Sequence, residues 1–288
     1  MTSQWHDTTI GDQITLQRGF DITRANQRPG TIPVISSSGI SSVHDTAMVD
    51  GPGVVLGRKG VVGSVYYVDT SYWPHDTTLW VKDFKGNLPR FVYYFFRGIA
   101  DRISGMDVGS ANPTLNRNHV HPIEVRWPAL PQQRAIAGVL GALDDKIEQN
   151  RRTAGVLERL ARAIFGAWFV DFEPVKAKAA GETAFPSMPQ PVFDALPTRF
   201  VDSEIGPVPE GWAVKAVSEI FGVNPARSLW KGESAPYLDM KSMPTKGHAP
   251  NSWIERPFGS GMRFMNGDTL VARITPCLEN GKTAFVDF

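Results

Sequence analysis

The residues from Pro131 to Phe169 constrain the fold most strongly, because they predict one long helix in a chain of otherwise short strands and turns. Proline suits a first helical position, and the sequence DFEP ends the helical pattern near Asp171. Apolar side chains recur every three to four residues, which is typical of a coiled coil. The predicted interface stripe contains Ile136, Leu140, Leu143, Ile147, Asn150, Leu157, Ile164 and Trp168.

This stripe predicts a second helix packed against the first. Asn150 lies inside the stripe, where a polar side chain is costly unless a partner satisfies it and commonly fixes register and partner choice. Glycines within a helix cost about 1 kcal/mol each relative to alanine. Their small size would permit another helix to approach closely at Gly138, Gly141, Gly155 and Gly166.

Residues 5–127 predict a mixed α+β domain. Short apolar or alternating segments separated by glycine and proline predict strands. These segments are DQITLQ, TIPVISS, GVVLG, GSVYYVD, TTLWVKD and HPIEVRW. The aromatic segment RFVYYFFRGIADRI, residues 90–103, predicts a helix on that sheet, and its rings are expected in the core instead of stacking on a ligand.

The chain beyond the long helix divides into a proline-rich segment and a weak repeat of the amino-terminal domain. WHDTTIGDQITL corresponds to WAVKAVSEIFGV, TIPVIS to SAPYLD, and GVVLGRKGVVGSVYYVD to GDTLVARITPCLENGKTAFVD. We predict an α+β domain at 1–130, the helix at 131–171, a long, partly extended connector at 172–208 and a partial second α+β domain at 209–288. The second copy stops near the counterpart of Thr70, so it is expected to lack a second long helix.

Composition sets limits on partners and location. The formal net charge of +1 gives no global attraction for nucleic acid, so DNA binding would need basic residues gathered on one face. The single cysteine, Cys277, excludes an internal disulfide and a multi-cysteine metal site. Because we find neither an apolar run that would span a bilayer nor signal-peptide features, we expect a cytoplasmic protein.

The motifs of common enzymes are missing from the sequence, which predicts no catalytic residue. There is no GxxxxGK[ST] loop, nucleotide-binding fingerprint or HExxH, and ANPT lacks the aromatic residue of an amino-methyltransferase loop. His119 and His121 would share one face of a strand, but without a visible third ligand we predict no metal site, and a metal enzyme is a remote alternative. Asp144 and Asp145 are expected to face solvent on the helix.

An ordered set of motifs resembles the specificity subunit of type I restriction-modification systems. The motifs are IPVISSSGI, VVLGRKGVVGSVYYV, GSANPTLNRNHVHPIEV followed by PALPQQRAIAGVLGALDDKIEQN, and the restart GPVPEGW. The resemblance implies two target-recognition domains, each reading half of a bipartite site on double-stranded DNA, with two long antiparallel helices as spacer. It also implies a non-catalytic subunit without cofactors, whose methyltransferase and restriction partners would bind S-adenosylmethionine, ATP and magnesium.

Within this resemblance the long helix is a spacer between DNA-reading domains. A helix over residues 131–169 would be about 57 Å long, or roughly seventeen base pairs at 3.4 Å each. Since the second helix is missing, the stripe is expected to pair in trans with a second specificity chain or half-subunit, or the chain is a fragment. The alternative is a coiled-coil interaction protein that binds a methyltransferase or another partner without reading DNA.

Three stretches supply candidate DNA contacts. In GRKG a basic pair on a glycine-bounded turn could bind phosphates or guanine, or form a solvated hairpin turn. GSANPTLNRN could contact DNA or only supply turn chemistry, and QRGFDITRANQRPG, in which Asp21 is the only acid, could be a plain exposed loop. The residues are Arg58, Lys59, Ser110, Asn112, Asn116, Arg117, Asn118, Arg18, Arg24 and Arg28. Ser36, Ser37 and Ser38 are expected in a hairpin turn.

Overall fold

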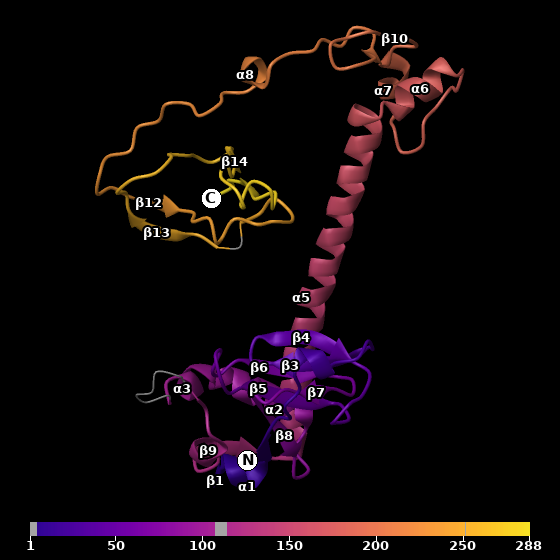
Figure 1. Ribbon diagram of the computed structural model, residues 1–288. Coiled ribbons are helices and arrows are strands. Elements are labelled where there is room, and N and C mark those ends of the chain that lie inside the picture. The colour runs from indigo at the N-terminus through magenta and orange to yellow at the C-terminus, as the bar shows by residue number, and fades with distance from the viewer. Residues whose placement is uncertain (1–4, 107–113, 251) are drawn as a thin grey trace. The chain divides into compact units, whose positions relative to one another are not determined.

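The computed structural model describes residues 5–106, 114–250 and 252–288 (Figure 1). The chain divides into two compact units, Met1–Arg151 and Arg152–Phe288, and each unit is described by itself. Over the described residues, no helix combines the length and the apolar character that crossing a membrane requires.

The amino-terminal unit is built on small sheets that are antiparallel except for one parallel strand pair, as expected for a mixed α+β domain (Figure 1). A four-stranded sheet has the order β2-β8-β5-β6, with bounds Thr15–Arg18, Thr78–Asp83, Gly53–Gly57 and Val65–Val68. A three-stranded sheet has the order β4-β3-β7, with bounds Gly39–His44, Ile32–Ser36 and Trp73–Pro74. Strands β1 (Trp5–Thr9) and β9 (Glu124–Pro128) pair with each other. The predicted strands are confirmed, whereas β1, β4 and β7 were not predicted.

The core lies between the four-stranded sheet and the aromatic helix. Helix α2 (Pro89–Gly98) packs on β5 and β6 and buries Phe91 and Phe96, so the aromatic cluster is structural as expected. The Trp127 ring lies edge-on to the Phe91 ring, with centroids 5.3 Å apart. The predicted helix over 90–103 is two helices, because Ile99 leaves the helical conformation at φ −113° before α3 (Ala100–Ser104) begins.

Three short helical segments connect the strands of this unit. Helix α1 (Ile10–Gln13) begins at a capping box, in which the Asp12 N–H donates to Thr9 Oγ1 at 3.2 Å and the Thr9 N–H donates to the Asp12 carboxylate. A 3₁₀ turn, η1, spans Arg24–Asn26, and α4 spans Arg117–Val120.

His121 joins α4 to β2. The Leu16 N–H donates to His121 Nε2 at 3.0 Å, beside the irregularity that shifts the β2 register between Thr15 and Leu16. A metal shared by His119 and His121 was considered for the case in which both lie on one face of a strand. The segment is not a strand, because residues 117–120 are helical and His121 is the carboxyl-terminal cap of α4. The pKa of His121 is lowered, mainly by burial and then by the positive charges of Arg117 and Lys85.

We expect the amino-terminal unit to lose stability as the pH falls below about 6.5, the ordinary histidine pKa. The lowered pKa means that the folded state disfavours the protonated ring, so the unfolded chain binds more protons in this range. Protonation also removes the acceptor of the Leu16 N–H. Denaturant unfolding between about pH 8 and about pH 5, a range that brackets the ordinary histidine pKa, measures the free energy of unfolding. Its dependence on pH should be flatter for His121→Gln, which keeps an acceptor. The control His119→Gln should retain the wild-type slope, and equal slopes for all three proteins would contradict this role.

The predicted long helix is present. Helix α5 runs from Leu130 to Phe165 and continues as a π-helical turn, η2, over Gly166–Val170 (Figure 1). Its buried residues, Gln133, Ala137 and Gly141, are spaced by four and form one face that packs on the amino-terminal unit.

The predicted interface stripe of α5 is largely exposed. The exposed fractions of Leu143, Ile147 and Leu157 are 57%, 47% and 58%, and Leu140 and Asn150 are also exposed. Ile164 and Trp168 are half-buried. Ile136 differs from the rest of the stripe because it packs against the core of the amino-terminal unit. Most of the stripe is therefore accessible to another helix.

Gln133 is the centre of a buried polar network that holds α5 to the amino-terminal unit. Its Oε1 accepts from the Leu88 N–H at 2.9 Å, at the amino-terminal cap of α2. Its Nε2 donates to Asn87 Oδ1 at 2.6 Å and to the Pro128 carbonyl at 3.0 Å. Asn87 Oδ1 also accepts from Trp127 Nε1 at 2.8 Å. The side chain is only 2% exposed and uses both its acceptor and its donors.

Two surface contacts join α2 to α5 farther along. Asp144 and Asp145 are exposed as expected, but Tyr94 Oη donates to Asp144 at 2.8 Å and Arg90 pairs with Asp145 at 2.7 Å. Gly141 permits this crossing, since a Cβ there would lie 3.0 Å from Arg90 Cζ. The other three glycines named above have no neighbour that close, so close approach is shown for one of the four.

After α5 and η2, the second unit contains two short helices where a partly extended connector was expected. Helix α6 spans Glu173–Ala179 and α7 spans Gln190–Ala195. Both carry proline in the first turn, where the missing N–H costs nothing, so these prolines start helices. Lys178 Nζ joins the two by donating to the carbonyls of Asp194 and Leu196 at 2.6 Å.

The remaining elements of this unit can be compared with the corresponding elements of the amino-terminal unit, which checks the predicted repeat. The elements are β10 (Phe200–Val201), β11 (Val208–Pro209), α8 (Val217–Ile220), β12 (Ser234–Tyr237), β13 (Ile254–Pro257), β14 (Thr269–Val271) and β15 (Thr283–Phe285). The β14–β15 hairpin has the same register as β5–β6 at the corresponding positions, with Thr269 opposite Phe285 where the first copy has Val54 opposite Tyr67. The register of this hairpin therefore agrees with the predicted repeat. The partial second recognition domain as a whole stays a prediction.

Candidate nucleic-acid interface

Three arginines from distant parts of the amino-terminal unit line one open cleft. The cleft has a volume of about 380 Å³. Its lining residues are Gln17, Arg18, Arg58, Leu79, Asn116 and Arg117. Each of the three stretches predicted from sequence to contact DNA contributes an arginine to this cleft. This gathering supplies the local positive charge that the net charge of +1 does not.

The backbone around Arg58 is held on both sides. Arg58 directly follows the buried strand β5, and its N–H donates to the Thr77 carbonyl at 2.8 Å. Its carbonyl accepts from the Leu115 N–H at 2.9 Å, which brings the segment before α4 beside the GRKG turn. Arg18 ends β2, and Arg117 is the first residue of α4. Regular elements therefore hold the three arginines in place.

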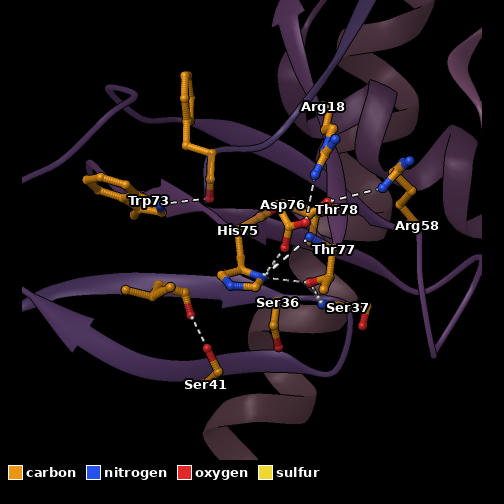
Figure 2. A network of polar contacts seen from close by, with 12 residues as sticks. Arg18, Ser36, Ser37, Ser41, Arg58, Trp73, His75, Asp76, Thr77 and Thr78 are labelled. Atoms are coloured by element: carbon orange, nitrogen blue, oxygen red, sulfur yellow. Dashed lines mark hydrogen bonds and ion pairs between the residues drawn. The ribbon is translucent and has the colours of Figure 1, made fainter. Parts of the chain in front are cut away.

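A polar loop at residues 75–77 contacts Arg18 and Arg58, as Figure 2 shows. The Asp76 carboxylate pairs with Arg18 at 2.8 Å and lies 3.1 Å from His75 Nδ1. The carbonyl of Asp76 accepts from Arg58 Nη1 at 3.4 Å. Thr77 Oγ1 lies 3.0 Å from His75 Nδ1 and accepts from the Ser37 N–H at 3.3 Å. One loop thus contacts two of the arginines and the neighbouring serine turn.

Sequence reasoning missed this loop, although a signal was present. The tripeptide His-Asp-Thr occurs at 44–46 and at 75–77, as well as at 6–8. In the first two places its aspartate pairs with a predicted arginine: Asp76 with Arg18, and Asp45 with Arg28. A repeated acid-containing tripeptide in a domain with several arginines could have indicated these pairs.

The charges in the cleft are unequal. Arg58 is half-buried, and its pKa is lowered by burial and by the positive charge of Arg18, against the opposing effect of Asp76. Arg117 and Lys59 are exposed, and neither forms an ion pair with any residue that the structure describes. Arg18 is the one arginine of the cleft that carries a carboxylate partner within the described residues.

Arg24 and Arg28 lie outside the lining of the cleft. Arg28 forms a bidentate pair with Asp45, with distances of 2.5 Å from Nε and 2.9 Å from Nη2. The pair raises the pKa of Arg28 and lowers the pKa of Asp45 to about 2. Asp21 is the only acid within this stretch, but Asp76 and Asp45, which are distant in sequence, pair with its Arg18 and Arg28.

The remaining candidates divide between turn chemistry and open surface. Asn116 caps α4 by accepting from the Asn118 N–H at 3.0 Å, which is the turn role left open above. Lys59 is bridged through its backbone to Thr114. The serine turn is confirmed as a hairpin, since Ser36 Oγ donates to the Gly39 carbonyl at 3.1 Å. Ser110 and Asn112 lie outside the described residues.

Asp21, His75 and Asp76 have possible metal-ligand atoms within 4.8 Å of one another. Two of these groups already have protein partners, because Asp76 accepts from Arg18 and His75 contacts Thr77. Neither His119 nor His121 belongs to a cluster of this kind in the described part of the chain. The arrangement fits a loop that positions arginines.

Two curated relatives are specificity subunits of type I restriction enzymes. The MjaIX subunit of Methanocaldococcus jannaschii is 26% identical over 166 residues, which cover 55% of this chain and 34% of the relative. The HindI subunit of Haemophilus influenzae is 27% identical over 192 residues, which cover 52% of this chain and 41% of the relative. The matches therefore span less than half of these relatives' own length.

A solved structure shows the fold, and a family model shows the family. The S subunit of a type I restriction-modification system from M. genitalium matches 99% of this chain and 71% of that chain, with a TM-score of 0.57 and 14% identity, and shows a shared fold. The family model of the type I restriction modification DNA specificity domain matches residues 2–159. Because this match covers more than half of the chain, the protein belongs to the family of type I restriction-modification DNA specificity domains.

Proposed function

We propose that this chain recognises one half of a DNA site as a non-catalytic specificity subunit of a type I restriction-modification complex. The observation that carries the proposal is the gathering of Arg18, Arg58 and Arg117 in one cleft of a chain whose net charge is only +1. Guanidinium groups bind both phosphates and base edges, and phosphate contacts position a protein on the duplex. The family membership of residues 2–159 supports DNA as the ligand.

The proposal assigns α5 a scaffold role. Its exposed leucines and isoleucines form a stripe on one face. If this stripe packs against another helix, each Å² of apolar surface that is buried stabilises the pair by about 25 cal/mol. We propose that the partner helix comes from a second specificity chain or half-subunit, and that methyltransferase and restriction subunits assemble on this scaffold. Those subunits would bind S-adenosylmethionine, ATP and magnesium, so this chain needs no cofactor.

Selection from a pool of random duplexes tests DNA recognition. The purified chain with its methyltransferase partner should enrich one half-site, and its affinity should fall steeply with salt because phosphate contacts release counterions. The readout is the sequence recovered after several rounds, together with the binding constant of the recovered duplex at several salt concentrations. A complex that forms with methyltransferase but enriches no sequence would favour the interaction protein that does not read DNA.

A further inference from the structure

We infer that Arg58 and Arg117 together bind a single backbone phosphate of the DNA in the cleft, instead of reading a base. The inference rests on the proposed function and assigns roles within the same site. The sequence alone is compatible with Arg58 binding either a phosphate or a guanine, because a guanidinium group can donate hydrogen bonds to both. The shape, charge and remaining hydrogen-bond donors of the cleft distinguish the two.

Shape favours the phosphate. Base edges lie at the floor of a major groove about 8.5 Å deep, so residues that read them must project from the protein. Phosphates form the protruding edges of the duplex. A concave surface lined by Arg58, Arg117 and the aliphatic side chain of Leu79 can receive such a ridge, but it cannot reach into a groove.

Charge favours an anion over a neutral base edge. Arg18 and Asp76 compensate each other at 2.8 Å, so their pair adds little net charge to the cleft. Arg58 and Arg117 have no carboxylate partner among the described residues. Arg58 is also half-buried, where an uncompensated charge is costly, and a bound phosphate would offset both the burial and the repulsion by Arg18.

The donors that remain unused are those a phosphate needs. Among the described residues, the Arg58 side chain makes one hydrogen bond, from Nη1 to the Asp76 carbonyl at 3.4 Å, and its other N–H groups have no acceptor there. Asn116 uses Oδ1 to cap α4, so its amide Nδ2 is free to donate, and the Gln17 amide makes no hydrogen bond within the described part of the chain. Two guanidinium groups and two amides suit the oxygens of one phosphodiester.

The salt dependence of binding tests this inference. For the recovered duplex, Arg58→Gln and Arg117→Gln should each reduce the slope of log K against log salt by about 1, and the selected sequence should stay the same. Arg102→Gln, which removes an exposed arginine of α3 outside the cleft, should leave the slope unchanged. Thermal unfolding of each variant checks that the fold is intact.

A second arm changes the DNA and compares the wild-type protein with Arg58→Gln. Methylphosphonate, which removes the charge of one phosphate, is placed at successive positions of the recovered duplex. One position should weaken wild-type binding, and the same substitution should have a much smaller effect on Arg58→Gln, because the two partners of one contact are coupled.

Two results overturn the inference and leave the proposed function intact. In the first, Arg58→Gln relaxes the preference for one base while the salt slope is unchanged, which makes Arg58 a base reader. In the second, both cleft variants behave as Arg102→Gln does. If the wild-type complex itself shows no sequence-selective, salt-dependent binding, the proposed function fails as well, and this outcome is distinct from the other two.

Discussion

Replacement of Gln133 by leucine is expected to lower the free energy of unfolding of the amino-terminal unit by about 2 to 4 kcal/mol. Leucine keeps most of the side-chain volume, so the loss reports hydrogen bonds more than packing. The Leu88 N–H at the start of α2 loses its acceptor, and Asn87 Oδ1 and the Pro128 carbonyl each lose a donor. A buried group without a partner costs about 1 to 3 kcal/mol, and Gln133 is 2% exposed.

Denaturant unfolding followed by tryptophan fluorescence measures this effect, because Trp127 belongs to the same network. Arg134→Ala is the matched control on the next residue of α5, which is exposed, and it should change the stability by less than about 0.5 kcal/mol. Equal stabilities for the two variants would show that the network does not hold α5 to the domain.

The elements that sequence predicted best are those whose pattern is local. Helix α5 follows from its spacing of apolar residues and from Pro131, and β5 follows from a continuous apolar run that the structure buries completely. Strand β4 was missed because its sequence GISSVH is polar and half-exposed at the edge of a sheet. The break at Ile99 was missed because an apolar residue continues the helical pattern there.

The candidate interface was predictable as residue types but not as a site. A basic pair between two glycines identified Arg58 and Lys59, yet nothing local shows that Arg18 and Arg117 meet Arg58 in one cleft. That meeting depends on pairing of β2 with β8 and on the hydrogen bond from Leu115 to Arg58. Asp45 and Asp76 pair with arginines 17 and 58 positions away in sequence. Pairs that tertiary structure creates cannot be read from spacing.

Replacement of Leu157 by asparagine is expected to weaken self-association of the chain at least about 100-fold if α5 pairs with another α5. Leu157 is 58% exposed on the stripe that carries Leu143 and Ile147, and the loss of one buried leucine contact costs about 2 to 5 kcal/mol. In a symmetric pair each helix loses the contact once, so the cost is counted twice. Sedimentation equilibrium over a range of protein concentrations measures the dissociation constant.

The control places the same side chain on the other face of the helix. Arg159 follows Leu157 by two positions, which is about 200° around a helix of 3.6 residues per turn, and it is exposed. Arg159→Asn should therefore dissociate with the wild-type constant. Circular dichroism should show the same helix content in both variants, because neither residue contacts the core of the amino-terminal unit. A monomeric wild-type chain with a fully helical α5 would rule out self-pairing, and pairing would then require the helix of a different specificity subunit.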